Sequence, residues 1–528
     1  MSKTRVVLLL VFLYNLANFF YKNFVLPRIR RRGAGYSLPP APDTWWFPVI
    51  GHLYAVWTRR HIEALDTIID TMNRGYREIR ATRGLSDPLD ISSSPAAKAA
   101  QEEYYATFPG AEFQVVNQSL AFPQSPEDIR YVTQDNFKNY IIGDLRVGIA
   151  QSFLGHGIFL SDDSYWRDQR NLAKPSFQNA NLEKMLATFH LHGLALLDAI
   201  GKAVRAGTSL DVQSMFLCYT LDASGDILFG HSIGSLHGHI PFQRAFDFVQ
   251  YETEKRATFP IWRYVPHGRY IECLKICDDF VGKIISTARA DPNLSERSDL
   301  LANFMTSLDE EGKTRALDDK FLRDTLMNFL IAGRDTTAMT LTWLFYELAS
   351  NPRIQQKAYE EIMTLFPNAD PTSLDEIRSL KYLKDCINET LRMHPPVPRV
   401  IRCARGDDVL PSGYVIKAGT NVIYNSYTLH RCEALWGADV LVFDPDRWSD
   451  DRTKAIGAYE FLPFHGGPRR CLGFDLAYNE VKMGALMILK NYEFTLDTSV
   501  KVRHMTAITL MAKDGVKIFF KKRQTSAC

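Results

Sequence analysis

Apolar residues recur at helical spacing along most of the chain, and this pattern predicts a mainly helical protein. The longest such stretch runs from Leu322 to Ser350 and stops before Pro352, a residue that cannot continue a helix. A second stretch, Phe474 to Leu489, directly follows a glycine-rich loop. Between residues 180 and 300 the pattern is amphipathic, with interruptions at Gly230, Pro260 and Pro266.

Shorter patterns predict the elements around these helices. Residues 60–80 are compatible with a helix, and residues 125–136 form another, because serine followed by proline is a common helix start. A further helix opens at Tyr165. Residues 85–101 are small and polar and residues 143–161 contain several glycines, so both segments are expected to be loops.

Alternating segments predict a few short strands. Residues 113–116 and 414–427 alternate well enough to form strands. The segment from Arg503 to Phe520 suggests a terminal hairpin, and its turn is expected to enter an interior pocket.

The N-terminus carries a hydrophobic segment, Val6 to Leu26, that is about long enough to span a bilayer. A group of arginines follows it, and the more positive side of such a segment stays in the cytoplasm. We expect a membrane anchor at residues 1–27, a basic, proline-rich hinge at 28–48 and one catalytic domain at 49–528. A helix that lies in the membrane interface is the alternative.

The composition narrows the possible functions. The 528 residues carry a formal net charge of +2, so no strong field indicates a nucleic-acid partner. The eight cysteines are scattered and none forms a C-x-x-C pair, which argues against a structural zinc site. Scattered thiols suit a reducing compartment better than a disulfide framework.

One cysteine differs from the others in its surroundings. Cys471 lies in the segment Phe464–Gly473, where five constrained positions follow the pattern F-x-x-G-x-R-x-C-x-G. Glycines let the backbone approach a large flat group closely, and Arg469 places a cation two residues before the sulfur. The following helix begins beside the sulfur, and its dipole favours a thiolate there. A thiolate is a soft, electron-rich metal ligand.

This segment resembles the haem-binding loop of the cytochrome P450 superfamily, the haem-thiolate monooxygenases. The resemblance implies that Cys471 is the axial iron ligand, whose thiolate pushes electron density onto the iron. It also implies that Phe464, Arg469 and Gly473 contact the haem. The implied fold is mainly α with small β-sheets, as a single large haem domain after an N-terminal anchor.

The long helix at residues 322–350 contains the segment Ala332–Thr337, with a glycine, an aspartate and two threonines. Glycine within a helix costs up to ~1 kcal/mol relative to alanine, so a buried helix that accepts these residues has a use for them. A helix kinked by local side-chain bonds is the plain alternative. The segment is similar to the family's oxygen-activation motif, A-G-x-D-T-T. The likeness implies a pocket beside Ala332 and Gly333, a proton-donating Thr336 and a proton-relaying Asp335.

Trp166 and Arg170 are four residues apart, so one helix face presents an indole N–H and a guanidinium, a donor pair for carboxylates. In the family, the corresponding helix binds the haem propionates. A later strand of the family carries another propionate-binding cation, here Arg402. By the same likeness, Val397 and Pro398 line the pocket over the haem.

Glu389 and Arg392 form an E-x-x-R pair on another predicted helix, a spacing that is usually a weak, solvated ion pair. In the family, this pair joins a later arginine, here Arg447, in a buried network that braces the haem core. The resemblance therefore implies a structural role for all three residues.

The resemblance also implies the reaction. Electrons from NADPH, supplied by a membrane-bound flavoprotein reductase, and O₂ would hydroxylate a small apolar substrate. Segments such as Asp407–Pro411 and Lys417–Thr420 look like fungal and plant members that oxidise fatty acids and alkanes at or near the chain end. Tailoring of a terpenoid or polyketide is the alternative, and a non-catalytic haem-binding sensor is the remote one. The expected location is the endoplasmic reticulum membrane, with the catalytic domain in the cytosol.

Overall fold

The structure is a computed structural model, and the residues it describes are 61–83, 95–107, 110–115, 118–238, 240–258, 267–308, 311–315, 317–449 and 456–524. The anchor expected at 1–27 and the hinge expected at 28–48 lie outside these residues. Within the described ranges, no helix combines the length and the apolar character needed to cross a bilayer.

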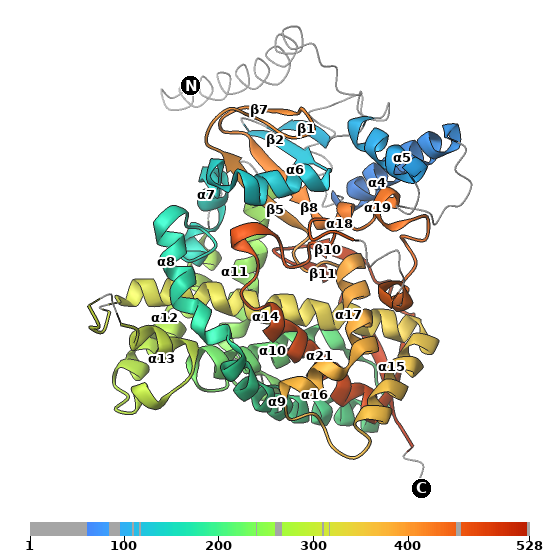
Figure 1. Cartoon of the computed structure of the whole chain (residues 1–528). Helices are drawn as coiled ribbons and strands as arrows, with labels where there is room; N and C mark the ends of the chain where they lie inside the picture. Colours follow the sequence, from blue (N-terminus) through green and yellow to red (C-terminus); the bar gives the residue numbers. More distant parts are fainter. Residues whose placement is uncertain are drawn as a thin grey trace, which may run out of the picture.

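Helix α14 (Asp319–Ser350) is the central element of the fold. Asp318 starts it as an N-cap whose side chain accepts a hydrogen bond from the Phe321 N–H. Its partners in the helical layer are α9 (Asn179–Ala206), α10 (Val212–Phe229) and α21 (Phe474–Asn491). Figure 1 shows these four helices lying together below the main sheet.

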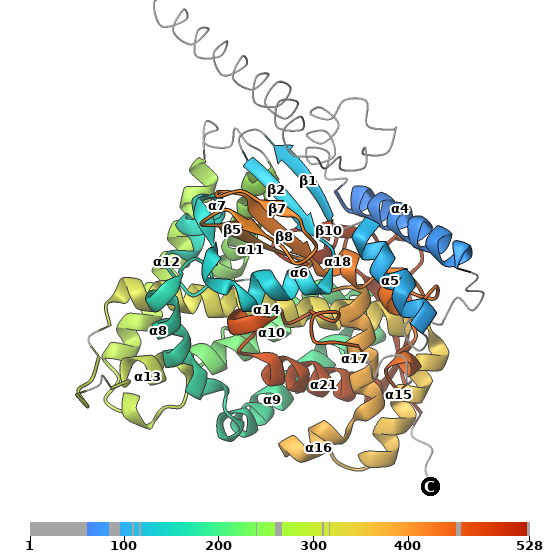
Figure 2. The ribbon, with the colours of Figure 1, turned by 45° about the horizontal axis from the view of Figure 1, so that its top comes forward.

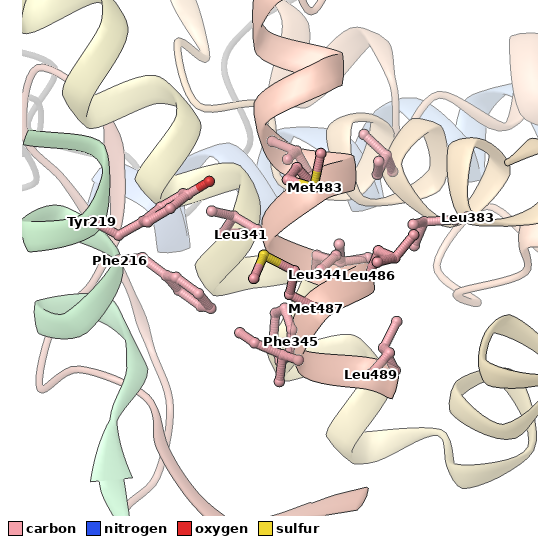
Figure 3. Packing of buried hydrophobic residues seen from close by; sticks show 14 of the residues in the cluster. Phe216, Tyr219, Leu341, Leu344, Phe345, Leu383, Met483, Leu486, Met487 and Leu489 are labelled. Atoms are coloured by element: carbon pink, nitrogen blue, oxygen red, sulfur yellow. The ribbon is translucent and has the colours of Figure 1, made fainter. Parts of the chain in front are cut away.

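The buried faces of these helices form one continuous hydrophobic cluster. Phe216 of α10 and Phe345 of α14 have ring centroids 5.2 Å apart, and α21 contributes methionines and leucines from the other side. Figure 3 shows this packing around Leu341, Leu344, Met483, Leu486, Met487 and Leu489. Each such side chain contributes roughly 1.5–3 kcal/mol when fully buried, so α14 is held firmly between α10 and α21.

The remaining helices surround this layer. The α-helices are α4 (His61–Thr82), α5 (Pro95–Thr107), α6 (Pro126–Arg130), α7 (Gly143–Leu154), α8 (Asp163–Ala173), α11 (Pro241–Thr258), α12 (Gly268–Arg289), α13 (Leu300–Met305), α15 (Pro352–Leu365), α16 (Leu374–Ser379), α17 (Lys381–Met393), α18 (Ser426–Leu429) and α19 (Glu433–Trp436). A π-helical turn, Tyr131–Asp135, continues directly from α6.

The described strands form four small sheets. The largest has the order β1-β2-β8-β5-β3, with β2 and β8 parallel and the other neighbours antiparallel. Its strands are β1 (Gly110–Val115), β2 (Gln118–Pro123), β3 (Tyr140–Ile141), β5 (Arg399–Ala404) and β8 (Asn421–Asn425). The others pair β4 (Leu210–Asp211), β12 (Lys517–Lys522) and β9 (Tyr492–Leu496), β6 (Asp408–Val409) with β7 (Val415–Ile416), and β10 (His504–Thr506) with β11 (Leu510–Ala512). In Figure 2 the main sheet packs above α14.

Most of the predicted elements are confirmed. The protein is mainly helical with small sheets, and α14 spans the predicted residues 322–350. Ser125 caps α6 by accepting a hydrogen bond from the Glu127 N–H at 3.2 Å. The terminal hairpin also forms, with β10 and β11 on either side of a short turn.

Two predicted loops are wrong. The segment 143–161 begins with helix α7: Gly143 at its start and Gly155 at its C-cap have φ values of +76° and +59°, and Gly148 lies within the helix. The segment 85–101 runs into helix α5 from Pro95 onward. Residues 85–94 lie outside the described part of the chain, so the correction concerns 95–101 alone. There Ala100 is buried, and one turn later Tyr104 meets Tyr76 of α4 edge to face at 5.4 Å. Tertiary packing thus overrides the small, polar local sequence.

Candidate active site

The Cys471 loop is fixed by backbone geometry on both sides of the sulfur. The Cys471 N–H donates to the Phe464 carbonyl at 3.0 Å, and Gly473 is the N-cap of α21. Gly467 has a φ of +64°, and a Cβ there would lie 2.0 Å from the Thr133 carbonyl oxygen. Only glycine fits this approach of two backbones. The loop therefore delivers the sulfur to one defined place at the start of α21.

The Cys471 side chain is surrounded by the protein on most sides, but it has exposed surface, which lines a cavity. Burial raises the pKa of this thiol, while the Gly473 N–H, Arg170 and Arg470 oppose the rise. The sequence analysis expected the helix N-terminus to favour a thiolate, but here its contribution is smaller than the cost of burial. A bound cation such as a metal ion is therefore needed to hold the thiolate form at neutral pH.

The cavity has a volume of about 300 Å³ and a mostly apolar wall. The wall contains many of the residues predicted from the sequence: Trp166, Arg170, Ala332, Gly333, Thr336, Val397, Arg402, Phe464, Arg469, Cys471 and Gly473. Two predicted residues are not part of it. Asp335 lies elsewhere on α14, and Pro396 takes the place expected for Pro398, whose carbonyl accepts a hydrogen bond from the Ser426 N–H at 2.7 Å.

Three arginines share one side of this cavity: Arg402 is buried, and Arg146 and Arg469 are partly buried. Arg469 is ion-paired with Asp162 at 2.7 Å, whereas Arg146 and Arg402 have no carboxylate partner among the described residues. Burial lowers the pKa of Arg146 to about 10 and of Arg469 to about 9, and in both cases the Arg402 charge lowers it further. Cations that repel one another inside a protein form a site for an anionic group.

Arg146 was missed by the sequence analysis. It lies on α7, in the segment expected to be a loop, and no short motif surrounds it. Its contribution depends on the fold, which brings α7 against β5 and so places Arg146 near Arg402. A helix between two glycines with one inward arginine gives no local signal of this kind.

Trp166 and Arg170, both on α8, make different contacts. The Arg469 guanidinium lies over the Trp166 ring, 4.5 Å from its centroid, which holds both side chains in the cavity wall. Arg170 donates to the Arg470 carbonyl at 2.7 Å. Arg170 therefore braces the backbone next to Cys471, while Trp166 packs on the arginine that faces the cavity.

The oxygen-motif segment of α14 is a continuous helix in the cavity wall. The Thr336 hydroxyl donates to the Ala332 carbonyl at 2.7 Å, one turn earlier. A Cβ on Gly333 would lie 3.0 Å from the Ser224 Oγ of α10, so the glycine allows the two helices to approach closely. Helix α14 continues without a break through Gly333.

Asp335 is buried behind the wall and linked to the outside through its neighbour. Arg334 contacts the Asp335 carboxylate at 3.1 Å and the Asp247 carboxylate of α11 at 2.6 Å, and the Asp247 side chain is 45% exposed. Burial raises the pKa of Asp335 to about 6, although Arg334 opposes the rise. A row of ionisable groups thus runs from the surface at Asp247 to the residue next to Thr336.

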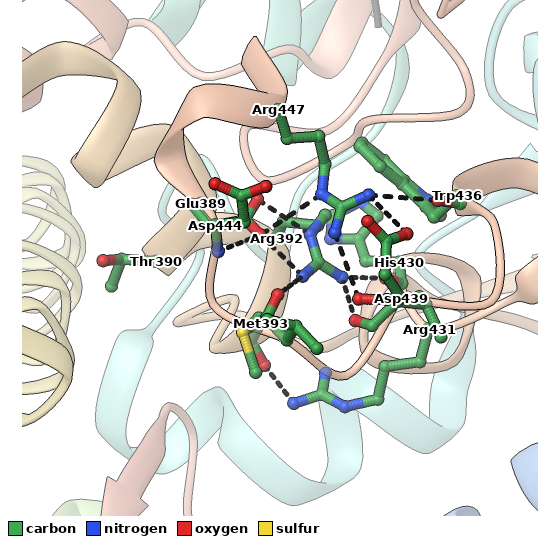
Figure 4. A network of polar contacts seen from close by, with 12 residues as sticks. Glu389, Thr390, Arg392, Met393, His430, Arg431, Trp436, Asp439, Asp444 and Arg447 are labelled. Atoms are coloured by element: carbon green, nitrogen blue, oxygen red, sulfur yellow. Dashed lines mark hydrogen bonds and ion pairs between the residues drawn. The ribbon is translucent and has the colours of Figure 1, made fainter. Parts of the chain in front are cut away.

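Glu389, Arg392 and Arg447 form a buried network away from the cavity (Figure 4). Arg392 contacts Glu389 at 2.8 Å and donates to the His430 and Val440 carbonyls, and Arg447 approaches Glu389 at 3.3 Å. Burial raises the pKa of Glu389, but Arg392 and Arg447 outweigh it and hold that pKa below its usual value. The network ties α17 to the segments before the Cys471 loop.

The comparisons with known proteins agree on one family. A family model described as Cytochrome P450 matches residues 97–519 of the chain. The chain belongs to the cytochrome P450 family. Cytochrome P450 86B1 of Arabidopsis thaliana is 32% identical over 452 residues, which cover 79% of this chain and 80% of that relative. Cytochrome P450 monooxygenase himC of Aspergillus japonicus is 34% identical over 439 residues, which cover 77% of this chain and 75% of that relative.

A solved structure shares the fold of this chain. The crystal structure of the cytochrome P450DA haem domain superposes with a TM-score of 0.71 at 21% sequence identity, covering 81% of this chain and 94% of that domain. The family match and the sequence relatives identify the chain as a cytochrome P450 monooxygenase, an oxidoreductase. The family implies a haem whose iron is bound by a cysteine thiolate.

The cavity fits such a haem on two observations. The Cys471 thiol in its wall needs a cation to become a thiolate, which a haem iron supplies. On another part of the wall, Arg146 and Arg402 lack carboxylate partners among the described residues, and a haem carries two carboxylates. The donor set thus matches the metal and the charged edge of the same group.

Asp335→Asn is expected to change how stability depends on pH. The folded protein keeps the Asp335 proton up to about pH 6, whereas an unfolded aspartate loses it near pH ~4. Ionising this buried carboxyl therefore destabilises the wild type, by up to about 3 kcal/mol, as the pH rises through this window. In urea denaturation, the free energy of unfolding of Asp335→Asn should not show this fall with rising pH. The exposed control Asp375→Asn should show it as the wild type does. Parallel pH curves for wild type and Asp335→Asn would contradict the assignment.

Proposed function

We propose that the chain hydroxylates an apolar substrate, a fatty acid or alkane at or near the chain end, with O₂ and electrons that a flavoprotein reductase delivers from NADPH. The observation that carries this proposal is the mostly apolar cavity whose wall contains both the Cys471 thiol and the Thr336 hydroxyl. Haem bound through Cys471 would leave the part of the cavity beside Thr336 for the substrate.

The proposal assigns the cofactor-holding roles to residues of the wall. Cys471 would ligate the iron, and Arg146, Arg402 and Arg469 would hold the haem carboxylates, with Trp166 beneath Arg469. Bound haem supplies the iron that activates O₂. Phe464 and Gly473 would contact the haem face beside the sulfur.

The proposal assigns proton delivery to two residues of α14, Thr336 and Asp335. The Thr336 hydroxyl holds a proton at the wall, and Asp335 lies one residue away with a pKa raised by burial to about 6. Such a group both holds and releases a proton near neutral pH. Arg334 and Asp247 connect it to the surface, so a proton lost to the cavity can be replaced from solvent.

Two features of the cavity wall support an apolar substrate: its apolar side chains, and the pairing of Arg399 with a carboxylate. Aliphatic and aromatic side chains from several elements line the cavity, among them Leu228, Phe329, Ile331 and Ile508. Arg399 also lines it, but it is ion-paired with Glu254 of α11. With that cation neutralised, the substrate end of the cavity presents mainly apolar surface, which favours a hydrocarbon chain.

Location and partner complete the proposal. The hydrophobic segment before residue 27 and the arginines after it suit an anchor in the endoplasmic reticulum membrane, with the catalytic domain in the cytosol. An anchored enzyme meets both a membrane-bound reductase and membrane-dissolved substrates. Arg470, which stands beside Cys471, is a candidate contact for an acidic flavin domain.

The test is turnover with a matched reductase on fatty acids and alkanes of graded length, with the oxidised carbon located by mass spectrometry. We expect one preferred length and oxidation at the terminal or an adjacent carbon, because a narrow cavity positions the chain end. Correctly ligated enzyme that is inactive on the whole panel would contradict the substrate class and transfer the search to terpenoid and polyketide scaffolds.

A further inference from the structure

A chain of polar side chains, of which Glu347 and His394 are buried and His504 is partly buried, joins the end of α14 to the C-terminal hairpin. Glu347 Oε1 and His394 Nε2 are 2.7 Å apart, and His394 Nδ1 and His504 Nε2 are 2.8 Å apart. Glu347 and His394 are 7% and 3% exposed. None of the three side chains belongs to the cavity wall. The chain therefore acts on the cavity only through what it holds in place.

What it holds is a short turn in the wall. Strands β10 and β11 are connected by residues 507–509, and the Ala507 N–H donates to the Thr509 carbonyl at 2.9 Å. Ile508 and Thr509 of this turn line the cavity. A shift of the hairpin along its own axis would change the depth of the cavity directly.

The second strand of the hairpin is fixed by two hydrogen bonds. The Leu510 N–H donates to the Pro396 carbonyl at 2.9 Å, and Trp343 of α14 donates from its indole N–H to the Leu510 carbonyl at 2.8 Å. On the first strand, β10, His504 contacts the same region through its hydrogen bond with His394. Trp343 also stacks on His394, with ring centroids 4.5 Å apart and planes inclined by 5°. The stacked pair of Trp343 and His394 is therefore hydrogen-bonded to both strands of the hairpin.

Which group donates and which accepts each of these two hydrogen bonds depends on whether Glu347 carries a proton. Burial lowers the pKa of His394 and of His504, so both rings are neutral at pH 7. Burial raises the pKa of Glu347 to about 7; Glu389 adds to that rise, and Arg431 and Arg392 oppose it. When Glu347 is ionised, His504 donates to His394 and His394 donates to Glu347. When it is protonated, both bonds reverse direction, and neither is lost.

We propose that Glu347, His394 and His504 are positioning residues for the substrate, which set how far the turn at residues 507–509 projects into the cavity. This inference rests on the proposed function, because the turn affects catalysis only if substrate occupies that cavity. The chain keeps its hydrogen bonds in either protonation state of Glu347, so it holds the turn equally on both sides of neutrality.

The test compares His504→Phe with His504→Gln in the haem-loaded protein. Phenylalanine keeps the ring contacts with Trp343 and Tyr427 but removes the hydrogen bond, whereas the glutamine amide replaces the ring nitrogen that bonds to His394. Met505→Leu, one residue along β10 and outside the wall, is the matched control. The probes are imidazole, which reports access to the iron alone, and N-dodecylimidazole, whose alkyl chain fills the cavity.

We expect His504→Phe to weaken N-dodecylimidazole about tenfold, the effect of one lost buried hydrogen bond, and to leave imidazole unchanged. His504→Gln and Met505→Leu should bind both probes as the wild type does. A second variant, Glu347→Leu, removes the other end of the chain and should give the same selective weakening. Equal weakening of both probes, or no weakening in either variant, would overturn the proposal. Because these measurements need no turnover, they stand even if the fatty-acid panel fails.

Discussion

Replacement of Cys471 by serine is expected to reduce product formation to background while the chain stays folded. The hydrogen bond from the Cys471 N–H to the Phe464 carbonyl does not involve the cysteine side chain, so the loop should keep its shape. A neutral hydroxyl is a far weaker ligand than a thiolate, and it cannot supply the electron density on which O–O cleavage depends. The absorption spectrum of the reduced protein with carbon monoxide measures the ligation directly.

The chain offers a matched control for this variant. Cys273 lies on α12, is partly buried and is not part of the cavity wall, so Cys273→Ser should leave both the spectrum and the turnover unchanged. If the serine variant at position 471 kept the thiolate-type spectrum with carbon monoxide, another cysteine would be the ligand, and the assignment of Cys471 would be wrong.

The second large effect is expected at Glu389. Substitution by glutamine leaves Arg392 and Arg447 as buried cations without their shared carboxylate, and Asp439 then offsets only the charge of Arg447. Breaking a buried ion pair in this way costs about 3–5 kcal/mol, a large part of the stability of a typical domain. Chemical denaturation of Glu389→Gln should show this loss, together with easier release of haem.

Glu360→Gln is the control for Glu389→Gln. Glu360 lies on α15 and is exposed, and its hydrogen bond with Gln356 is on the surface, so its replacement should change stability by less than about 1 kcal/mol. An equally small change at Glu389 would show that the network contributes little, and that the haem core is braced in another way.

The parts of the site that the sequence predicted are those with a local cause. The Cys471 loop needs glycine at position 467, where a side chain would strike the Thr133 carbonyl, and such a need is visible in the sequence as a fixed spacing. The segment of α14 around Gly333 was predictable because poor helix formers stand out in a long apolar helix. The hairpin turn at Ile508 followed from strand alternation.

The parts that were missed depend on contacts between distant segments. Arg146 joins the cavity because α7 packs on β5, and its helix looks like a loop since glycines mark its two ends. The chain from Glu347 through His394 to His504 joins residues 47 and 110 positions apart, so no window of sequence contains it. Burial also reversed one expectation, since it raises the pKa of the Cys471 thiol more than the helix end lowers it.

The central claim is that this cavity inserts one oxygen atom from O₂ into an apolar substrate. The most direct measurement is turnover under isotopically labelled O₂, with reductase and NADPH present and the product analysed by mass spectrometry. The account predicts a product that carries one labelled oxygen atom, in the wild type but not in Cys471→Ser. A product whose new oxygen comes from water, or equal labelling in both proteins, would contradict it.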